Sequence, residues 1–105
     1  MAAESRKQQI ETMLREDPND PFLNYGLAME YVSAGEDAAA VAQFQHLFEV
    51  APDYVPGYLM AAQTLVRLNR NDDARSMLQR GLVAAQKSHN QHASEEMQAL
   101  LETLG

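Results

Sequence analysis

The sequence of 105 residues contains no cysteine. This absence excludes disulfide bonds, thiolate metal ligands and a cysteine nucleophile. Its five glycines are scattered singly, so no glycine-rich loop is available to cradle a phosphate group. Four prolines and no long polar tract argue against disorder, and an apolar content of 46% can bury one modest core. We therefore expect one folded domain over residues 1–105.

Long hydrophobic runs are also missing. The uncharged stretches around residues 38–48 and 54–66 are too short and too interrupted to span a bilayer. The N-terminal stretch "MAAESRKQQ" reaches charged residues at once and lacks the apolar core of a secretory signal. We expect a soluble, cytoplasmic protein that has no membrane partner. Nucleic acid is not an expected partner either, because a net charge of −7 would repel a phosphate backbone.

The charge is distributed unevenly along the chain. Residues 67–87 hold five basic and two acidic side chains, whereas acidic residues prevail before and after this stretch. A solvated helix face is the simplest interpretation of the basic stretch. Two alternatives remain open: the stretch steers an acidic partner, or it contacts the acidic N-terminal half of the protein itself.

The sequence repeats itself with a period of thirty-four residues. A period of this length is typical of helical arrays, in which each unit buries its apolar face against its neighbours. No segment alternates as a β-strand would, so the repeat predicts an all-α fold. The matching pairs are Pro18 and Pro52, Ala28 and Ala62, Val32 and Val66, Gly35 and Asn69, Ala40 and Ala74, Phe44 and Leu78, and Phe48 and Leu82.

Helix start and stop signals divide each unit into a helical hairpin. Asp20 is suited to cap a helix that begins at Pro21 and ends at Gly35, which can adopt the left-handed conformation. In the second unit we expect Asp53 and Asn71 to act as N-caps and Asn69 to adopt the left-handed conformation. The predicted helices are 21–34, a second running to about 50, a third after Asp53, and a fourth that follows Asn71 and runs to about Lys87.

The stretch "NYGLAMEY" resembles the tetratricopeptide repeat motif W-x2-L-G-x2-Y, with Asn24 in place of Trp and Ala28 in place of Gly. The motif continues as A-x3-F and a closing Pro, at Ala40, Phe44 and Pro52. The second unit matches less well and has Gln86 where the closing Pro would stand. The resemblance covers about residues 20–87 and implies two stacked repeats, at 20–53 and 54–87.

Apolar stripes flank the two repeats and predict a capping helix at each end. Ile10, Met13 and Leu14 form such a stripe within residues 5–16. A second stripe lies within residues 90–104 and consists of Ala93, Met97, Leu100, Leu101 and Leu104. We expect about five helices in total, with the outer two covering the ends of the array.

Few side chains are arranged for chemistry. His89 and His92 stand three residues apart in "KSHNQHAS", but no third metal ligand accompanies them. His46 lies among apolar residues in a repeat helix, where a partly buried structural histidine is expected. No serine is placed on the strained turn that a hydrolase nucleophile needs. We expect no enzyme activity, no bound metal and no cofactor.

The first helix of each predicted hairpin carries a further row of mostly apolar residues. By resemblance to the family, this row lines a concave groove in which extended peptides or helices bind. An exposed row of this size would be an unusual apolar patch, but neighbouring helices and the C-terminal helix could equally cover it. The row consists of Phe22, Tyr25, Met29, Val32, Leu59, Met60, Gln63, Val66 and Arg67.

The resulting prediction is a non-catalytic module that binds a protein or peptide partner in an apolar groove. Arg67 is the only cation near the row, which disfavours the acidic chaperone tails that some family members bind. A short amphipathic helix or an extended peptide with large hydrophobic anchors is the expected ligand. The alternative is a homo-oligomeric scaffold, in which another copy of the chain occupies the groove or an end of the array.

Overall fold

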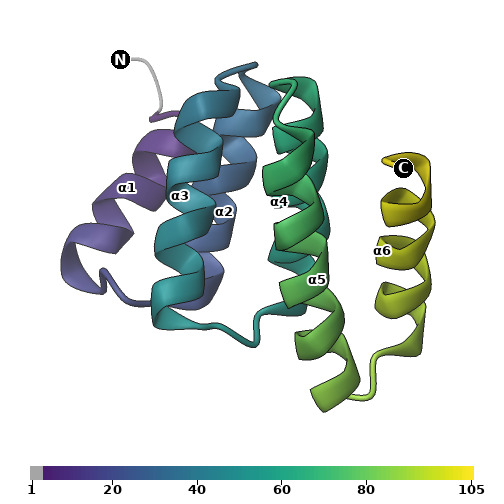
Figure 1. The fold of residues 1–105 in the computed structure, drawn as a ribbon. Coiled ribbons are helices and arrows are strands. Elements are labelled where there is room, and N and C mark those ends of the chain that lie inside the picture. The colour runs from purple at the N-terminus through teal and green to yellow at the C-terminus, as the bar shows by residue number, and fades with distance from the viewer. Residues whose placement is uncertain (1–3) are drawn as a thin grey trace.

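Residues 4–105, which are those described by the computed structural model, form six α-helices and no β-strand (Figure 1). The all-α fold with antiparallel helical hairpins is confirmed. The expected number of about five helices is wrong, because two hairpins contribute four helices and each flanking segment adds one more. The helices are α1 (Arg6–Glu16), α2 (Pro21–Ser33), α3 (Asp37–Val50), α4 (Val55–Arg67), α5 (Asn71–Lys87) and α6 (Gln91–Thr103).

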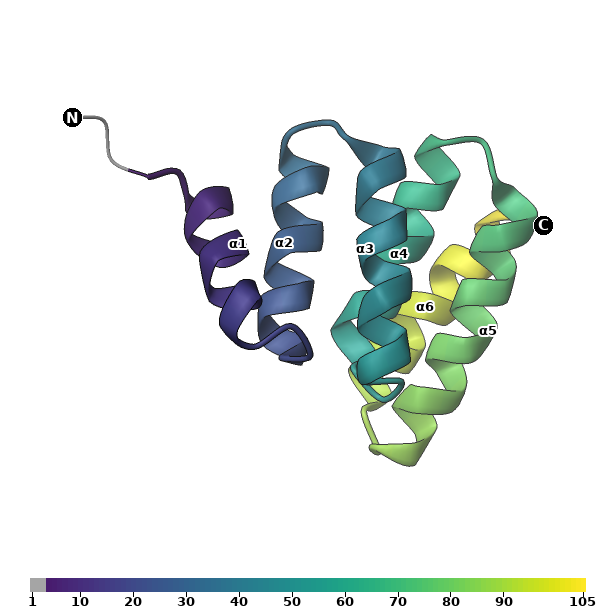
Figure 2. The same cartoon turned by 90° about the vertical axis from the view of Figure 1, so that its left-hand side faces the viewer.

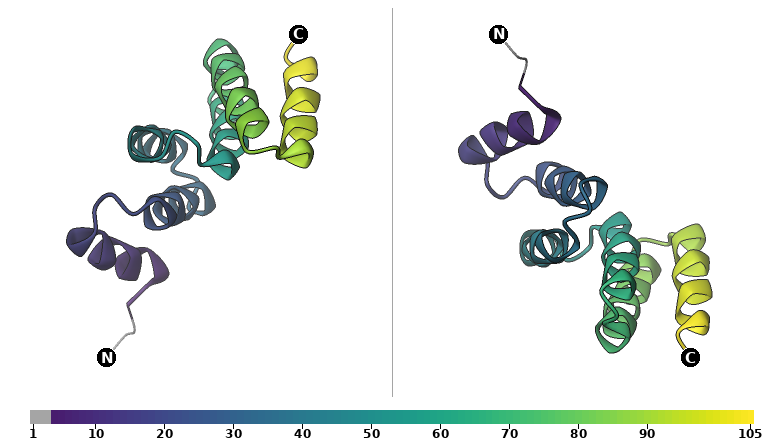
Figure 3. Two further views of the ribbon diagram at one scale, coloured as in Figure 1. Left: turned by 90° about the horizontal axis from the view of Figure 1, so that it is seen from below. Right: turned by 90° about the horizontal axis from the view of Figure 1, so that it is seen from above.

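Consecutive helices run antiparallel and stack into an elongated array of 49 × 28 × 20 Å. The most extensive contacts are within the hairpins α2–α3 and α4–α5. At one end α1 packs on α2 (Figure 2), and at the other α6 packs on α5 and also reaches α4 (Figure 3). Within the described residues, no helix has the length and apolarity needed to cross a membrane.

Side-chain caps and left-handed residues set several helix ends. An Asp20 carboxylate oxygen accepts a hydrogen bond from the Leu23 amide at 2.9 Å, which confirms the predicted cap. Gly35 and Asn69 have φ angles of 75° and 60°, as predicted for residues that end helices. The other two caps were predicted wrongly. Each lies one residue away from the actual N-cap, and neither start has a side-chain cap: Tyr54 precedes α4 and Arg70 precedes α5.

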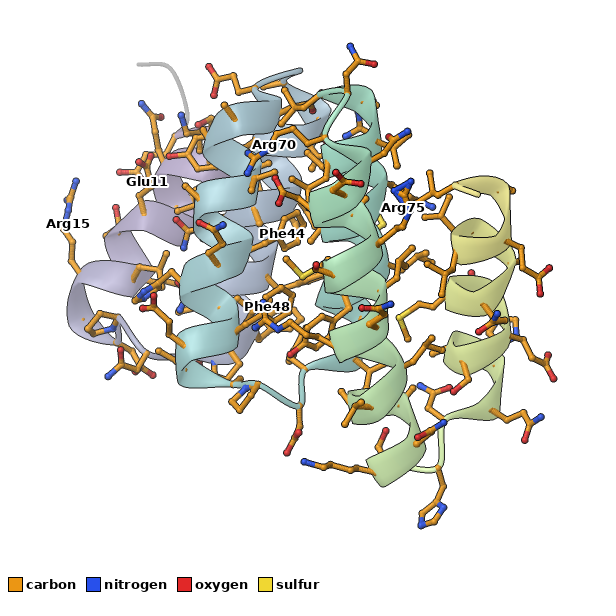
Figure 4. The ribbon with its side chains drawn as sticks, in the orientation of Figure 1. Glu11, Arg15, Phe44, Phe48, Arg70 and Arg75 are labelled. Carbon is orange, nitrogen blue, oxygen red and sulfur yellow. The ribbon has the colours of Figure 1, made fainter. Side chains whose placement is uncertain are left out.

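The core lies between the two hairpins and extends under α6. Phe44 and Phe48 project from α3 towards the α4–α5 hairpin (Figure 4), and the ring of Phe48 stacks on that of Tyr58 at 3.9 Å. Small residues permit the close approach of the paired helices, since larger side chains there would overpack the interface. The fully buried alanines at these positions include Ala28, Ala40, Ala62 and Ala74.

Asn24 is a buried polar residue at the position where the repeat motif has Trp. Its amide nitrogen donates to the carbonyl oxygens of Pro18 at 3.0 Å and Asp20 at 2.9 Å. Its side-chain oxygen accepts from the Gln43 amide at 2.7 Å. Asn24 therefore ties the loop before α2 to α2 and α3 by hydrogen bonds, in a position where the motif uses a large apolar side chain.

Replacing Asn24 with leucine is expected to lower the free energy of unfolding by about 1–3 kcal/mol, because buried polar groups would lose their partners. Urea denaturation followed by circular dichroism would measure the change. Gln45→Leu is the control, since Gln45 is exposed on α3 and should alter stability by less than about 0.5 kcal/mol. Equal stabilities for Asn24→Leu and the wild-type protein would contradict this role.

Candidate interaction surface

Three alternate helices, α2, α4 and α6, surround a hollow of about 260 Å³, which we call the central hollow. One side chain of α2, Tyr25, contributes to it, and α4 and α6 supply the rest. Apolar groups prevail in its lining. The residues that line it are Tyr25, Val55, Pro56, Leu59, Met60, Asn90, His92, Ala93, Glu96 and Met97.

The turn between α5 and α6 places α6 against this hollow. His89 has a φ angle of 56°, a left-handed conformation that reverses the chain after α5. The side-chain oxygen of Asn90 then accepts a hydrogen bond from the Ala93 amide at 3.1 Å and caps α6. The buried face of α6 carries Met97, which is fully inaccessible. One wall of the hollow therefore depends on the packing of α6.

Tyr25 belongs to an aromatic cluster beneath the hollow. Its ring centroid lies 5.3 Å from that of Tyr54 and 6.4 Å from that of Phe44. Burial, reinforced by the neighbouring Tyr54, raises the pKa of Tyr25 above its ordinary value of 10.0. Burial and the nearby charge of Asp20 raise the pKa of Tyr54 in the same direction. Both phenols are therefore neutral at physiological pH, and this wall carries no charge.

Polar side chains on α4 and α6, the two helices that supply most of the lining, are held in pairs. His92 Nε2 lies 2.8 Å from a Glu96 carboxylate oxygen, one turn away on α6. Arg67 donates from Nε and Nη2 to the Asp37 carboxylate at 3.2 and 3.1 Å, which links α4 to the start of α3. The cation predicted to lie near the groove is thus already paired with a carboxylate. What remains open to a ligand is mainly apolar surface.

The structure brings only part of the predicted row together. Tyr25, Leu59 and Met60 line the central hollow. Phe22 is 69% exposed and lines a separate hollow of about 160 Å³ between α1 and α2, beside Ile10 and Met13. Three other apolar members of the row are half-buried against the core: Met29, Val32 and Val66. Gln63 is half-buried on α4.

Sequence reasoning considered the C-terminal helix, α6, only as a possible cover over the row and not as a wall of a hollow. Ala93 and Met97 were assigned only to a capping stripe, and His92 was considered only as a metal ligand. Their helical spacing indicated an apolar face but not which neighbour it would meet. His92 pairs with Glu96 instead, and within residues 4–105 no three His, Cys, Asp or Glu side chains are grouped to hold a metal ion.

Stacked antiparallel helix pairs, with a hollow lined by alternate helices, define a helical-repeat protein of the α-solenoid class. The family model described as tetratricopeptide repeat matches residues 31–102. The chain belongs to the tetratricopeptide repeat family. The match includes α6, which lies beyond the residues that carry the motif resemblance.

Solved structures agree with this family. A tetratricopeptide repeat domain protein from Salinibacter ruber is 33% identical, with a TM-score of 0.76 over 83% of this chain and 88% of that chain. The type III secretion translocator chaperone SycD from Yersinia enterocolitica shares the fold at 16% identity, with a TM-score of 0.86 over 93% and 68%. PcrH, solved with the chaperone binding region of PopD, shares it at 17% identity, with a TM-score of 0.87 over 93% and 74%. A comparison with curated proteins gave no match.

Proposed function

We propose that this protein is a non-catalytic interaction module that binds a peptide or short helix of a partner protein in the central hollow. Membership of a repeat family supports a protein-binding role. Two structures with the same fold also support a protein-binding role, because SycD is a translocator chaperone and PcrH was solved with the chaperone binding region of PopD.

The observation that carries this proposal is the apolar lining of the central hollow by three separate helices. Its volume of about 260 Å³ suits one or two side chains of a peptide. Pockets for drug-sized molecules are larger, at about 300–1,000 Å³. Each large apolar side chain that becomes fully buried contributes at most about 1.5–3 kcal/mol before the costs of association. Two such anchors contribute at most about 6 kcal/mol, so micromolar affinity, which needs about 8 kcal/mol, requires further contacts outside the hollow.

Met60→Glu tests the proposal by placing a carboxylate in the lining of the hollow. Desolvation of the charge is expected to weaken partner binding at least about tenfold. Wild-type protein would first be used to capture partners from the native cell, and mass spectrometry would identify them. Titration of a purified partner segment by calorimetry would then give the affinity of each variant.

Met13→Glu is the matched control, because Met13 is 47% exposed on α1 and lies outside the central hollow. It should bind the partner segment as the wild-type protein does. Loss of stability in Met60→Glu without any loss of binding would show that Met60 serves only the core. A stable dimer in sedimentation experiments, with Met60 covered by the second copy, would favour the homo-oligomeric scaffold instead.

A further inference from the structure

A second concave surface runs along α5, bordered by residues of α3, of α4 and of the loop between them, and shares no lining residue with the central hollow. It consists of two hollows that meet at Arg80, and we call it the Arg80 furrow. One hollow, of about 260 Å³, is bordered by Asp53, Tyr58, Val83 and Lys87. The other, of about 150 Å³, is bordered by residues that include Gln45, Arg70 and Asp73.

Aromatic rings hold the guanidinium group of Arg80 in this furrow. Its central carbon lies 5.6 Å from the ring centroid of Phe48 and 5.7 Å from that of Tyr58. These two rings are stacked on each other, and the Tyr58 hydroxyl donates a hydrogen bond to the Pro52 carbonyl. Phe48 projects from α3 towards α5 in Figure 4. The guanidinium group therefore rests on a rigid aromatic support, which fixes its orientation before any ligand arrives.

Two cations that line the furrow, Arg80 and Lys87, form no ion pair within the described residues. Arg67, Arg70 and Arg75 each form an ion pair with an aspartate, at 3.1, 2.8 and 2.9 Å. Within residues 4–105, neither Arg80 nor Lys87 has a carboxylate within 4.0 Å. Internal ion pairs thus neutralise three of the five cations in the basic stretch of the sequence, and the remaining two both line the furrow.

Carboxylates of the furrow do not cancel this charge. Asp73 is already paired with Arg70. The lining then holds one further carboxylate, Asp53, beside the two cations that form no ion pair, Arg80 and Lys87. The local excess of positive charge contrasts with the net charge of −7 on the whole protein. Such a contrast favours an acidic ligand at this surface and disfavours one elsewhere.

Val83 adds an apolar element between the two cations. It is 52% exposed and lies three residues after Arg80 and four before Lys87, on the same side of α5. The furrow therefore offers a fixed guanidinium group, an exposed valine and a flexible ammonium group along one stripe of the helix. A ligand that matches this stripe carries carboxylates next to an apolar side chain.

We propose that the Arg80 furrow is a second docking site, which binds an acidic segment of a partner protein. A planar guanidinium group can pair with a carboxylate through two parallel hydrogen bonds, and Arg80 provides the anchor of this kind. An apolar side chain next to that carboxylate packs on Val83, and Lys87 attracts a second acidic group. With the central hollow on α2, α4 and α6, the protein then binds two segments of different chemistry on two surfaces.

Two blocked peptides test this site: acetyl-Leu-Asp-Glu-Leu-amide and its neutral counterpart acetyl-Leu-Asn-Gln-Leu-amide. Each is titrated into isotopically labelled protein and followed by nuclear magnetic resonance. We expect the acidic peptide to shift the Arg80 Nε–H signal and the amide signals of Tyr58 and Val83, and the neutral peptide to leave them unchanged. Equal shifts with both peptides, no shift with either, or shifts confined to Tyr25 and Met60 would overturn the proposal.

Variants of α5 separate the furrow from a general charge effect. Arg80→Met keeps an apolar stem over the rings and removes the charge, and is expected to weaken binding of the acidic peptide roughly tenfold. Arg75→Met makes the same chemical change where the arginine is paired with Asp72, and should bind as the wild-type protein does. Equal affinities for the two variants would count against the site.

Arg80→Lys provides a second variant with the charge retained, in case Arg80→Met is poorly folded. Lysine lacks the planar fork, so weaker binding than that of the wild-type protein is expected. Unchanged affinity in this variant would show that the furrow acts only as a diffuse positive field. Melting curves of all variants confirm that each is folded before it is titrated.

Discussion

Replacing Phe44 with alanine is expected to lower the free energy of unfolding by about 3–5 kcal/mol. Phe44 is completely inaccessible to solvent, and its ring lies beside that of Tyr25 in the core between the helices. The truncation removes apolar contacts and leaves a cavity that the stacked helices can close only in part. Because a domain of this size is stable by about 5–15 kcal/mol, the loss is a large fraction of the total.

Urea denaturation, followed by the helical circular dichroism signal, would measure this loss, and the melting temperature should fall on the order of 20 °C. Phe22→Ala is the matched control, since Phe22 is 69% exposed and its truncation should change stability by less than about 0.5 kcal/mol. Similar losses in both variants would mean that Phe44 does not lie at the centre of the core.

The fold could be predicted from the sequence where residue type alone dictates backbone geometry. Gly35 and Asn69 have the left-handed conformation because few other residues tolerate it, and both end a helix as expected. Asp53 shows the limit of such reasoning. A side chain can cap a helix in this way only from the N-cap position, and the N-cap of α4 is Tyr54, one residue after Asp53. Residue type therefore predicted that a helix starts here, but not which residue precedes it.

The candidate surface was predictable only within single helices. Resemblance to the family included Leu59 and Met60 of α4 in the row, and both line the central hollow. The pairing of Arg67 with Asp37 joins residues thirty positions apart, which no local pattern indicates. The support of Arg80 by Phe48 and Tyr58 likewise depends on how three helices meet. Contacts between distant segments, rather than the helices themselves, set the charge of each surface.

Gly81→Val is expected to lower the free energy of unfolding by about 3 kcal/mol, at the upper end of the usual range for overpacked cores. A Cβ atom added at Gly81 would lie 2.5 Å from the Met97 sulfur and 2.6 Å from the Tyr58 Cβ. The thioether can move aside, but Tyr58 Cβ is fixed by the backbone of α4. The new side chain must therefore push α5 away from α4, from α6 or from both.

The same substitution should also weaken binding at the central hollow, because displacement of α6 moves Ala93 and Met97, which form one of its walls. Thermal melting and titration of a partner segment would measure the two effects. Gly26→Ala is the control at the α1–α2 contact. The added Cβ there meets only the end of the Ile10 side chain, at 3.3 Å, so better helix propensity should stabilise the protein by up to about 1 kcal/mol. If Gly81→Val retained wild-type stability, α6 could not be packed against α5 and α4 as closely as the hollow requires.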